Sequence, residues 1–327
     1  MPGIWVHRAH EGEDGTLPTV TTSPAPGPLQ RYPRRHGATG DLRRWRDVEL
    51  PGLGRRSDLY VWLPPRYDRH RSQRYPVVYL HDGDNLFDRR KAFAGVTWEA
   101  DRALMALHDE GHDVIAVGVP CSPHRRIEEY SPYHQRGLGG GDADAYVAFL
   151  TDHLKPWVDA ALRTRPEREH TMIAGSSLGG VVSLHAWLRR PDVFGGIGAF
   201  STAFWVPGER HLRELEEALA APHPPTRFYL DVGGREIPDA AHRQDAYQRD
   251  TERVVGAMQR AGVPLLYTYD SQAYHFENAW AARLPAALSW LTAGYAVEQP
   301  SEPRGGLLAT LRSGLRRLAP ARLSSSR

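Results

Sequence analysis

Strand-like and helix-like hydrophobic patterns alternate through the middle of the chain. Two β-like stretches lie within residues 45–65, and five later runs have the pattern of buried strands: residues 75–80, 114–119, 169–174, 227–232 and 265–269. Patterns typical of helices occur at 181–188 and at about 245–261, and Gly262 and Pro264 bound the second. This alternation predicts the α/β class, with a mainly parallel central sheet and helices on both faces.

The two ends of the chain lack this periodicity. Residues 1–40 are rich in Pro, Gly, Thr and Arg, which predicts a flexible N-terminal arm. Residues 296–327 form a basic tail in which leucines between Leu307 and Leu318 recur at helical spacing. A solvated tail with transient helicity is favoured there over an amphipathic helix that touches a membrane or a partner. We therefore expect an arm at 1–40, one catalytic domain at 41–295 and a disordered tail at 296–327.

A G-x-S-x-G motif stands between a predicted strand and a predicted helix. Gly175, Ser177 and Gly179 supply its fixed positions. A serine on such a turn exposes its hydroxyl above the edge of the sheet, and the helix that follows offers N–H donors to a developing oxyanion. A capping serine in a glycine-rich turn would give the same local pattern. The strand–turn–helix context favours Ser177 as a catalytic nucleophile.

The acid of a serine hydrolase of this architecture follows the nucleophile and precedes the histidine in the chain. Glu236 lies just past the predicted strand 227–232, on the rim where open α/β sheets bind ligands. Asp231, within the strand pattern, and Asp239, further along the loop, are alternatives. Glu236 is the preferred candidate because it stands at the break between strand and loop.

The base is predicted from its place after the last strand. His275 follows that strand, precedes a helix and is the only histidine in the last 80 residues. Most of the 16 histidines lie in polar segments that suggest no such role. Glu277, two residues past His275, is expected to brace the following loop or helix rather than to reach the imidazole.

The oxyanion hole needs two backbone N–H groups. Leu178, the residue after the nucleophile, supplies one. The other is expected from the loop after the predicted strand 75–80, where the N–H of Asp84 follows Gly83.

A wider resemblance includes these residues. The chain resembles the esterase family of the α/β-hydrolase superfamily that includes siderophore, feruloyl and acetylxylan esterases, S-formylglutathione hydrolases and mycobacterial mycolyltransferases. The resemblance covers roughly residues 45–295. It is carried by Val61–Tyr67, His81–Phe87, Trp98–Glu99, Arg125–Arg126, Glu129–Pro132, Gly175–Gly180, Ser201, Phe204–Trp205, Tyr229–Glu236, His275 and Trp280.

The resemblance implies the α/β-hydrolase fold and a serine carboxylic-ester hydrolase that forms an acyl-enzyme. In this role Ser177 is the nucleophile, His275 the general base and Glu236 the acid, although the family more often has Asp at the acid position. The substrate is expected to be a small siderophore, carbohydrate or aryl ester, and no metal or organic cofactor is implied. An acyltransferase of the mycolyltransferase type and a non-catalytic binding protein on the same fold are the alternatives.

Four residues are candidates for substrate binding. Arg126 could bind a carboxylate or polyol, or it could form a buried brace with a glutamate. Trp98 follows the predicted oxyanion loop. Trp205 and Tyr274 could form an aromatic wall, and core packing would explain them almost as well.

The overall composition adds few constraints. The net charge of +2 gives no argument for nucleic-acid binding, and the single cysteine, Cys121, excludes an intramolecular disulfide. No N-terminal leader pattern and no run long enough to span a membrane are visible, so a cytoplasmic location is expected. The oligomeric state is open.

Overall fold

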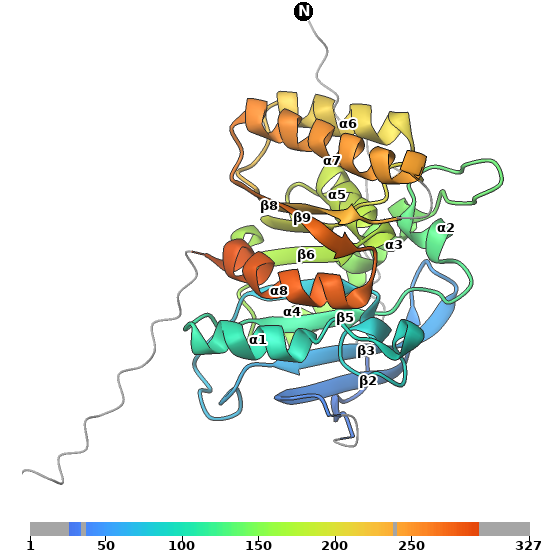
Figure 1. Cartoon of the computed structure of the whole chain (residues 1–327). Helices are drawn as coiled ribbons and strands as arrows, with labels where there is room; N and C mark the ends of the chain where they lie inside the picture. Colours follow the sequence, from blue (N-terminus) through green and yellow to red (C-terminus); the bar gives the residue numbers. More distant parts are fainter. Residues whose placement is uncertain (1–25, 34–36, 238–240, 294–327) are drawn as a thin grey trace, which may run out of the picture. The chain divides into compact units, whose positions relative to one another are not determined.

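One sheet of nine strands runs through residues 26–33, 37–237 and 241–293, the part of the chain that the computed structural model describes (Figure 1). The strand order is β1-β2-β3-β5-β4-β6-β7-β8-β9. Neighbours from β1 to β5 pair antiparallel, and neighbours from β5 to β9 pair parallel. The strands are β1 (Gln30–Arg31), β2 (Asp41–Leu50), β3 (Arg55–Leu63), β4 (Val77–His81), β5 (Ile115–Val119), β6 (Thr171–Ser176), β7 (Gly196–Phe200), β8 (Arg227–Arg235) and β9 (Leu265–Tyr274). The predicted α/β class with a mainly parallel sheet is confirmed.

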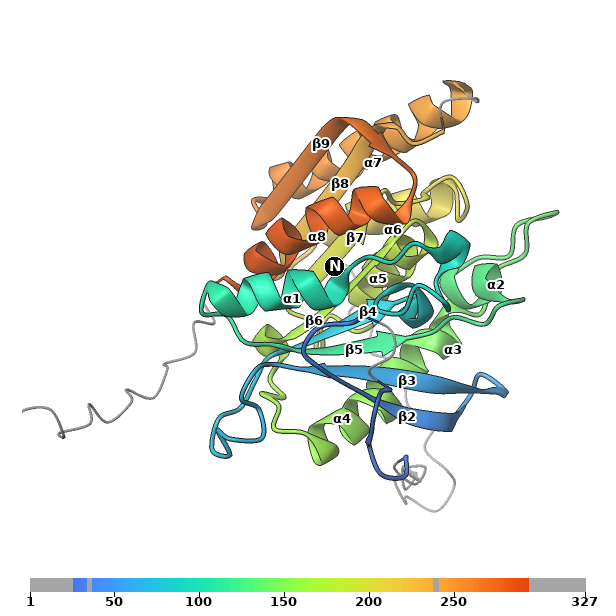
Figure 2. The same ribbon diagram turned by 60° about the horizontal axis from the view of Figure 1, so that its bottom comes forward.

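Helices cover both faces of this sheet (Figures 1 and 2). The helices are α1 (Ala100–Asp109), α2 (Arg126–Tyr130), α3 (Ala143–Ala148), α4 (Lys155–Ala161), α5 (Leu178–Arg189), α6 (Glu209–Ala220), α7 (Ala241–Ala261) and α8 (Glu277–Thr292). α1 and α8 pack on one face and α3 to α7 on the other, which gives two apolar cores. The central strands β4 to β7 are buried along their whole length. Burial on both faces explains their nearly continuous apolar sequences.

Element boundaries differ most from the prediction at β9. This strand continues to Tyr274, past the predicted end at residue 269. β9 is the edge strand of the sheet, and several side chains of its second half are exposed. Polar residues are therefore tolerated there. Because they interrupt the hydrophobic pattern, the strand could not be recognised from hydrophobicity beyond residue 269. The extension brings β9 to the residue directly before His275.

The N-terminal segment contributes to the sheet, which the prediction of an arm at 1–40 did not include. β1 pairs with β2, and the adjoining Tyr32 is buried with its N–H donating to the carbonyl of Leu42 at 2.8 Å. Residues 1–25 and 34–36 of the expected arm, and the whole of the expected tail at 296–327, lie outside the described residues. The domain limits therefore stay predictions. In the described part of the chain no helix is long and apolar enough to cross a membrane.

Candidate active site

Ser177 forms the turn between β6 and α5 by itself, because β6 ends at Ser176 and α5 begins at Leu178. Its backbone has φ 57° and ψ −118°, a conformation that L-residues rarely adopt. Its N–H donates to the carbonyl of Phe200 at 2.8 Å, and its carbonyl accepts from the N–H of Ala203 at 3.2 Å. Hydrogen bonds to the next strand and its loop thus hold the strained turn.

Glycine is required beside the turn because neighbouring groups approach closely. A Cβ on Gly175 would lie 2.8 Å from the imidazole of His81 and 3.0 Å from the backbone of Gly179. His81 is buried beneath the turn, and burial lowers its pKa to about 3, so the ring is neutral. Its Nδ1 lies 3.0 Å from the hydroxyl of Tyr146. The motif glycines therefore permit His81 to pack directly under the nucleophile.

His275 and Glu236 meet at the ends of β8 and β9. The imidazole Nδ1 of His275 lies 2.7 Å from Oε2 of Glu236, while Oε1 of Glu236 accepts from the N–H of Gly233. Glu236 is buried, and a carboxylate can only accept here, so Nδ1 carries the proton and Nε2 is free to act as a base. A Cβ on Gly233 would collide with the carbonyl of Ala273. Glycine at this position allows the two strands to approach where the pair forms.

Two aromatic rings fix the plane of the imidazole. The ring of His275 lies 5.0 Å from that of Trp280 at 87° and 5.1 Å from that of Tyr247 at 53°. Burial raises the pKa of the Tyr247 phenol, and hydrogen bonds from Trp205 and from Ser177 partly oppose this. Tyr247, on α7, is thus beside both Ser177 and His275. Sequence reasoning missed it because it sits among polar residues on a long helix.

The alternative acids have different surroundings. Asp231 is fully buried on β8, where it forms an ion pair with Arg283 at 2.7 Å and accepts from the hydroxyl of Tyr229 at 2.8 Å. Its carboxylate is therefore engaged away from the imidazole. Asp239 lies outside the described residues. Glu277 accepts from the amide of Asn85 at 3.3 Å, which joins the start of α8 to the loop after β4.

The loop after β4 begins with a left-handed residue. Asp82 has φ 52° and ψ 47°, and a short 3₁₀ helix, η2 (Gly83–Asn85), follows it. The N–H of Asn85 donates to the carbonyl of Asp82 at 2.7 Å. In the described part of the chain, the backbone N–H groups of Asp84 and Leu178 have no such acceptor. Leu178 directly follows Ser177, and Asp84 lies in the loop after β4, so their role as oxyanion donors stays a prediction.

Arg126 is held by an aspartate, whereas the two alternatives predicted were a substrate carboxylate or polyol and a brace with a glutamate. Its guanidinium binds both carboxylate oxygens of Asp82 at 2.8 and 2.7 Å, and it approaches the carbonyl of Ser176 at 3.4 Å. Burial alone would raise the pKa of Asp82, but the charge and hydrogen bonds of Arg126 hold it below the ordinary value. The buried Arg–Glu pair of this region is instead Arg55 with Glu129, at 2.6 Å. The Asp82 carboxylate was missed because nothing local in the sequence marks its partner.

A cavity of about 500 Å³ opens at this edge of the sheet. It is lined by Asp82, Asp84, Asn85, Lys91, Phe93, Cys121, Pro123, Arg126, Ser176, Ser177, His275, Phe276, Glu277 and Trp280. Of the predicted substrate-binding residues, Arg126 lines it and Trp98, Trp205 and Tyr274 do not. Trp98 is buried against Trp280, with ring centres 5.8 Å apart. Trp205 packs on the core, and the exposed Tyr274 accepts a hydrogen bond from Arg235 at 2.9 Å.

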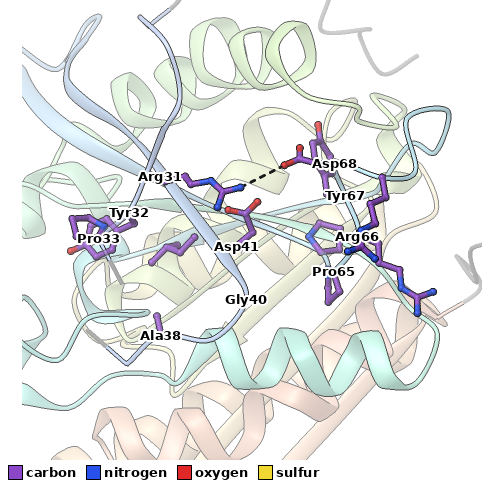
Figure 3. A pocket seen from close by; sticks show the side chains of 13 residues that line it. Arg31, Tyr32, Pro33, Ala38, Gly40, Asp41, Pro65, Arg66, Tyr67 and Asp68 are labelled. Atoms are coloured by element: carbon purple, nitrogen blue, oxygen red, sulfur yellow. Dashed lines mark ion pairs between the residues drawn. The ribbon is translucent and has the colours of Figure 1, made fainter. Parts of the chain in front are cut away.

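A second cavity, of about 490 Å³, lies elsewhere on the sheet (Figure 3). Residues of β1, of the start of β2 and of the turn after β3 line it, and Arg31 and Asp68 form an ion pair across it at 4.0 Å. None of Ser177, Glu236 and His275 lines it. The active-site candidate is therefore the cavity at the carboxyl ends of the strands.

Relatives with similar sequences include esterases. The chain is 25% identical over 249 residues to the uncharacterized protein YbbA of Bacillus subtilis, covering 72% of this chain and 92% of that protein. It is 27% identical over 213 residues to the iron(III) salmochelin esterase of Escherichia coli, covering 61% and 47%. The chain thus spans most of YbbA but about half of the salmochelin esterase.

Solved structures share the fold. The siderophore hydrolase EstA from Aspergillus nidulans superposes with a TM-score of 0.63 at 19% identity, covering 80% of this chain and 98% of that one. An IroE-like serine hydrolase from Shewanella oneidensis gives 0.61 at 19% identity, covering 76% and 78%. These neighbours confirm the predicted α/β-hydrolase fold.

The family assignment rests on the sequence match over most of the sheet and its helices. The model of the family described as "Putative esterase" matches residues 51–291. This confirms the resemblance inferred from the motifs and, at the level of the family, the expected carboxylic-ester hydrolase activity. The chain belongs to the "Putative esterase" family.

Proposed function

We propose that the chain hydrolyses carboxylic esters through a Ser177–His275–Glu236 triad. The observation that carries this proposal is the 2.7 Å contact between Nδ1 of His275 and the buried Glu236, because His275 lines the same cavity as the strained Ser177. The contact leaves Nε2 as the imidazole nitrogen that can take a proton. The siderophore esterases among the relatives support an ester substrate, and a siderophore, carbohydrate or aryl ester is the class proposed here.

The reaction has two steps. Nε2 of His275 takes the proton of the Ser177 hydroxyl while its oxygen forms a bond to the ester carbonyl carbon. The N–H groups of Leu178 and Asp84 bind the oxyanion, and the positive end of α5 adds to its stabilisation. The tetrahedral intermediate expels the alcohol, which receives the proton from Nε2. Water, deprotonated by the same nitrogen, then releases the acid from Ser177.

Arg126 supports this chemistry by holding the loops together. Its bidentate pair with Asp82 connects α2 to the residue before the oxyanion loop, and its contact with the carbonyl of Ser176 reaches the residue before the nucleophile. Both oxygens of Asp82 are occupied, so the guanidinium has a fixed position. We assign it to positioning of these two loops.

The test is hydrolysis of p-nitrophenyl acetate by Ser177→Ala, with Ser183→Ala as a matched control. Ser183 is buried on α5 and donates to the carbonyl of Gly179 at 2.8 Å. Ser177→Ala should lower kcat/KM by roughly three or more orders of magnitude while circular dichroism stays unchanged. A fluorophosphonate should label the wild type at Ser177. Labelling at Ser176 instead, or full activity of the Ser177 variant, would contradict the proposal.

A further inference from the structure

One carboxylate of the cavity, outside the proposed triad, has no cationic partner among the described residues. Glu277 is the first residue of α8, follows His275 by two positions and is only 4% exposed. It lines the same cavity as Ser177. Burial raises the pKa of this carboxyl group. Buried carboxylates are normally paired with a cation or saturated with hydrogen bonds, because removal from water is costly.

Within the described residues, the carboxylate of Glu277 accepts from the side-chain amide of Asn85 at 3.3 Å and also interacts with its own backbone N–H. The orientation of that amide is defined, because its Oδ1 accepts from the N–H of Phe93 at 2.9 Å and its NH₂ must then face Glu277. These two contacts leave acceptor positions of the carboxylate unused. Glu277 is therefore held in position with acceptor capacity to spare.

The two cationic side chains of the cavity are both paired with carboxylates other than Glu277. Arg126 is paired with Asp82 at 2.7 Å, and Lys91 lies 3.5 Å from Asp84. Within the described residues, no cation lies within the 4.0 Å of an ion pair from Glu277. The cavity wall thus carries three carboxylates and two cations, and the excess negative charge belongs to Glu277.

The position of Glu277 indicates which part of an ester it faces. His275 must return its proton to the leaving oxygen, so the alcohol part of the substrate lies against the His275 loop. Phe276, Glu277 and Trp280 line the cavity on the same loop and helix. The alcohol part therefore approaches Glu277, which lines the cavity beside Phe276 and Trp280.

We propose that Glu277 binds a positively charged group on the alcohol part of the substrate ester. The inference rests on the proposed hydrolysis and deepens it by naming the charge of the substrate. A cation at this place would complete the third charge pair of the cavity and satisfy the free acceptor positions of Glu277. An anion there would face an unpaired carboxylate, so anionic alcohols are disfavoured.

The experiment compares three acetate esters that differ in the charge of the alcohol: acetylcholine, its neutral isostere 3,3-dimethylbutyl acetate, and 2-sulfoethyl acetate. For the wild type, kcat/KM should fall in that order. Glu277→Gln keeps an acceptor for Asn85 but removes the charge, and it should lower the ratio of cationic to neutral ester by about tenfold. Because each ratio is taken within one enzyme, a general loss of rate cancels.

Glu217→Gln is the matched control, since Glu217 is exposed on α6 and does not line the cavity. It should keep the wild-type ratio. A second measurement needs no variant: choline should inhibit hydrolysis of p-nitrophenyl acetate by the wild type competitively and more strongly than 3,3-dimethylbutanol does.

Equal or inverted preference in the wild type, or an unchanged ratio in Glu277→Gln, would overturn the inference. Equal inhibition by the two alcohols would do the same. Failure of the proposed function is distinguishable, because the wild type would then not hydrolyse p-nitrophenyl acetate at all.

Discussion

His211 should make the protein sensitive to acid. It lies on α6, is fully buried, and has no hydrogen-bond partner for either ring nitrogen in the described part of the chain. Burial, together with the nearby His185 and Arg189, lowers its pKa from 6.5 to about 3. The ring of His185 is 5.9 Å away and that of Tyr133 is 6.4 Å away. Among the described residues, no carboxylate bonds to either ring nitrogen of His211, so the folded state holds the ring neutral.

The magnitude follows from proton linkage. In the unfolded chain His211 takes up a proton below its ordinary pKa of about 6.5, whereas in the folded protein it does so only near pH 3. Between these values the unfolded state binds one more proton, so the free energy of unfolding falls by about 1.4 kcal/mol for each pH unit of acidification. This loss of stability is absent at pH values above the pKa of His211 in the unfolded chain, and it grows as the pH falls below that pKa. Burial also lowers the pKa of His81 to about 3. His81 therefore lowers the free energy of unfolding further as the pH falls.

Urea unfolding of the wild type and of His211→Leu between pH 7.5 and pH 4.5, followed by circular dichroism, measures this effect. Leucine fills a similar volume without a titrating group, so the variant should gain stability relative to the wild type by about 1.4 kcal/mol per pH unit below pH 6. His124→Gln is the control, because His124 is exposed and its loss should leave the pH profile unchanged. Parallel profiles for the wild type and His211→Leu would refute the reasoning.

Two further predictions concern the triad. Glu236→Gln should lower kcat on p-nitrophenyl acetate by about 10²–10⁴, because it favours the wrong imidazole tautomer, and Glu236→Asp should be milder. Asp231→Asn should instead cost about 3–5 kcal/mol of stability, since it leaves Arg283 buried without its counter-charge, with kcat of the folded enzyme retained; the reverse pattern would move the acid to Asp231. Tyr247→Phe keeps the ring against the imidazole and removes the hydroxyl beside the nucleophile. It should lower kcat several-fold with KM unchanged, and a kcat equal to that of the wild type would show that the hydroxyl has no part in the reaction.

The sequence was most informative where local pattern and chemistry coincide. Ser177 and His275 each stand between a strand pattern and a helix pattern, and Glu236 stands where a strand pattern ends, so their neighbours in the chain identify them. Pairings between distant segments could not be read in this way. Asp82 and Arg126 are 44 positions apart, and Asn85 and Glu277 are 192 apart. Their contacts depend on which strands lie side by side, which no local pattern encodes.

Three residues that we predicted to bind substrate do not line the cavity, because a local sequence pattern does not reveal which distant segments meet. Trp98 and Trp205 are large aromatic residues near the catalytic loops in sequence, and hydrophobicity alone does not distinguish a cavity wall from a core. In the fold the indole of Trp98 is buried against Phe200, with ring centres 5.3 Å apart. Tyr274 directly precedes His275 in the chain, but its side chain is 46% exposed at the end of the edge strand β9. Exposure does not alternate regularly along the second half of this strand, where the register with β8 shifts, so strand periodicity could not predict this orientation.

Three adjacent parallel strands end in the same strained way. β4, β6 and β7 are each followed by a non-glycine residue with positive φ: Asp82 at 52°, Ser177 at 57° and Ser201 at 41°. Each such residue costs of order 1–3 kcal/mol, most of which glycine would avoid. The side chains explain why glycine is absent. Asp82 binds Arg126, Ser177 carries the nucleophilic hydroxyl in our proposal, and the hydroxyl of Ser201 accepts from the indole N–H of Trp280 at 3.0 Å.

The strain at Ser177 and Ser201 is sustained because each of these two turns is tied to the next strand, whereas the N–H of Asp82 donates to the hydroxyl of Tyr130 at 3.1 Å. The N–H of Ser177 donates to the carbonyl of Phe200, at the end of β7, and the N–H of Ser201 donates to the carbonyl of Asp231 on β8 at 3.2 Å. A turn that relaxed alone would lose a buried hydrogen bond and leave its acceptor unpaired, at a cost of about 1–3 kcal/mol that matches the strain. The turns at Ser177 and Ser201 therefore support each other, and Trp280, bound to Ser201, packs against the ring of His275. In this way Ser177 and His275 are held by the same pair of strand ends.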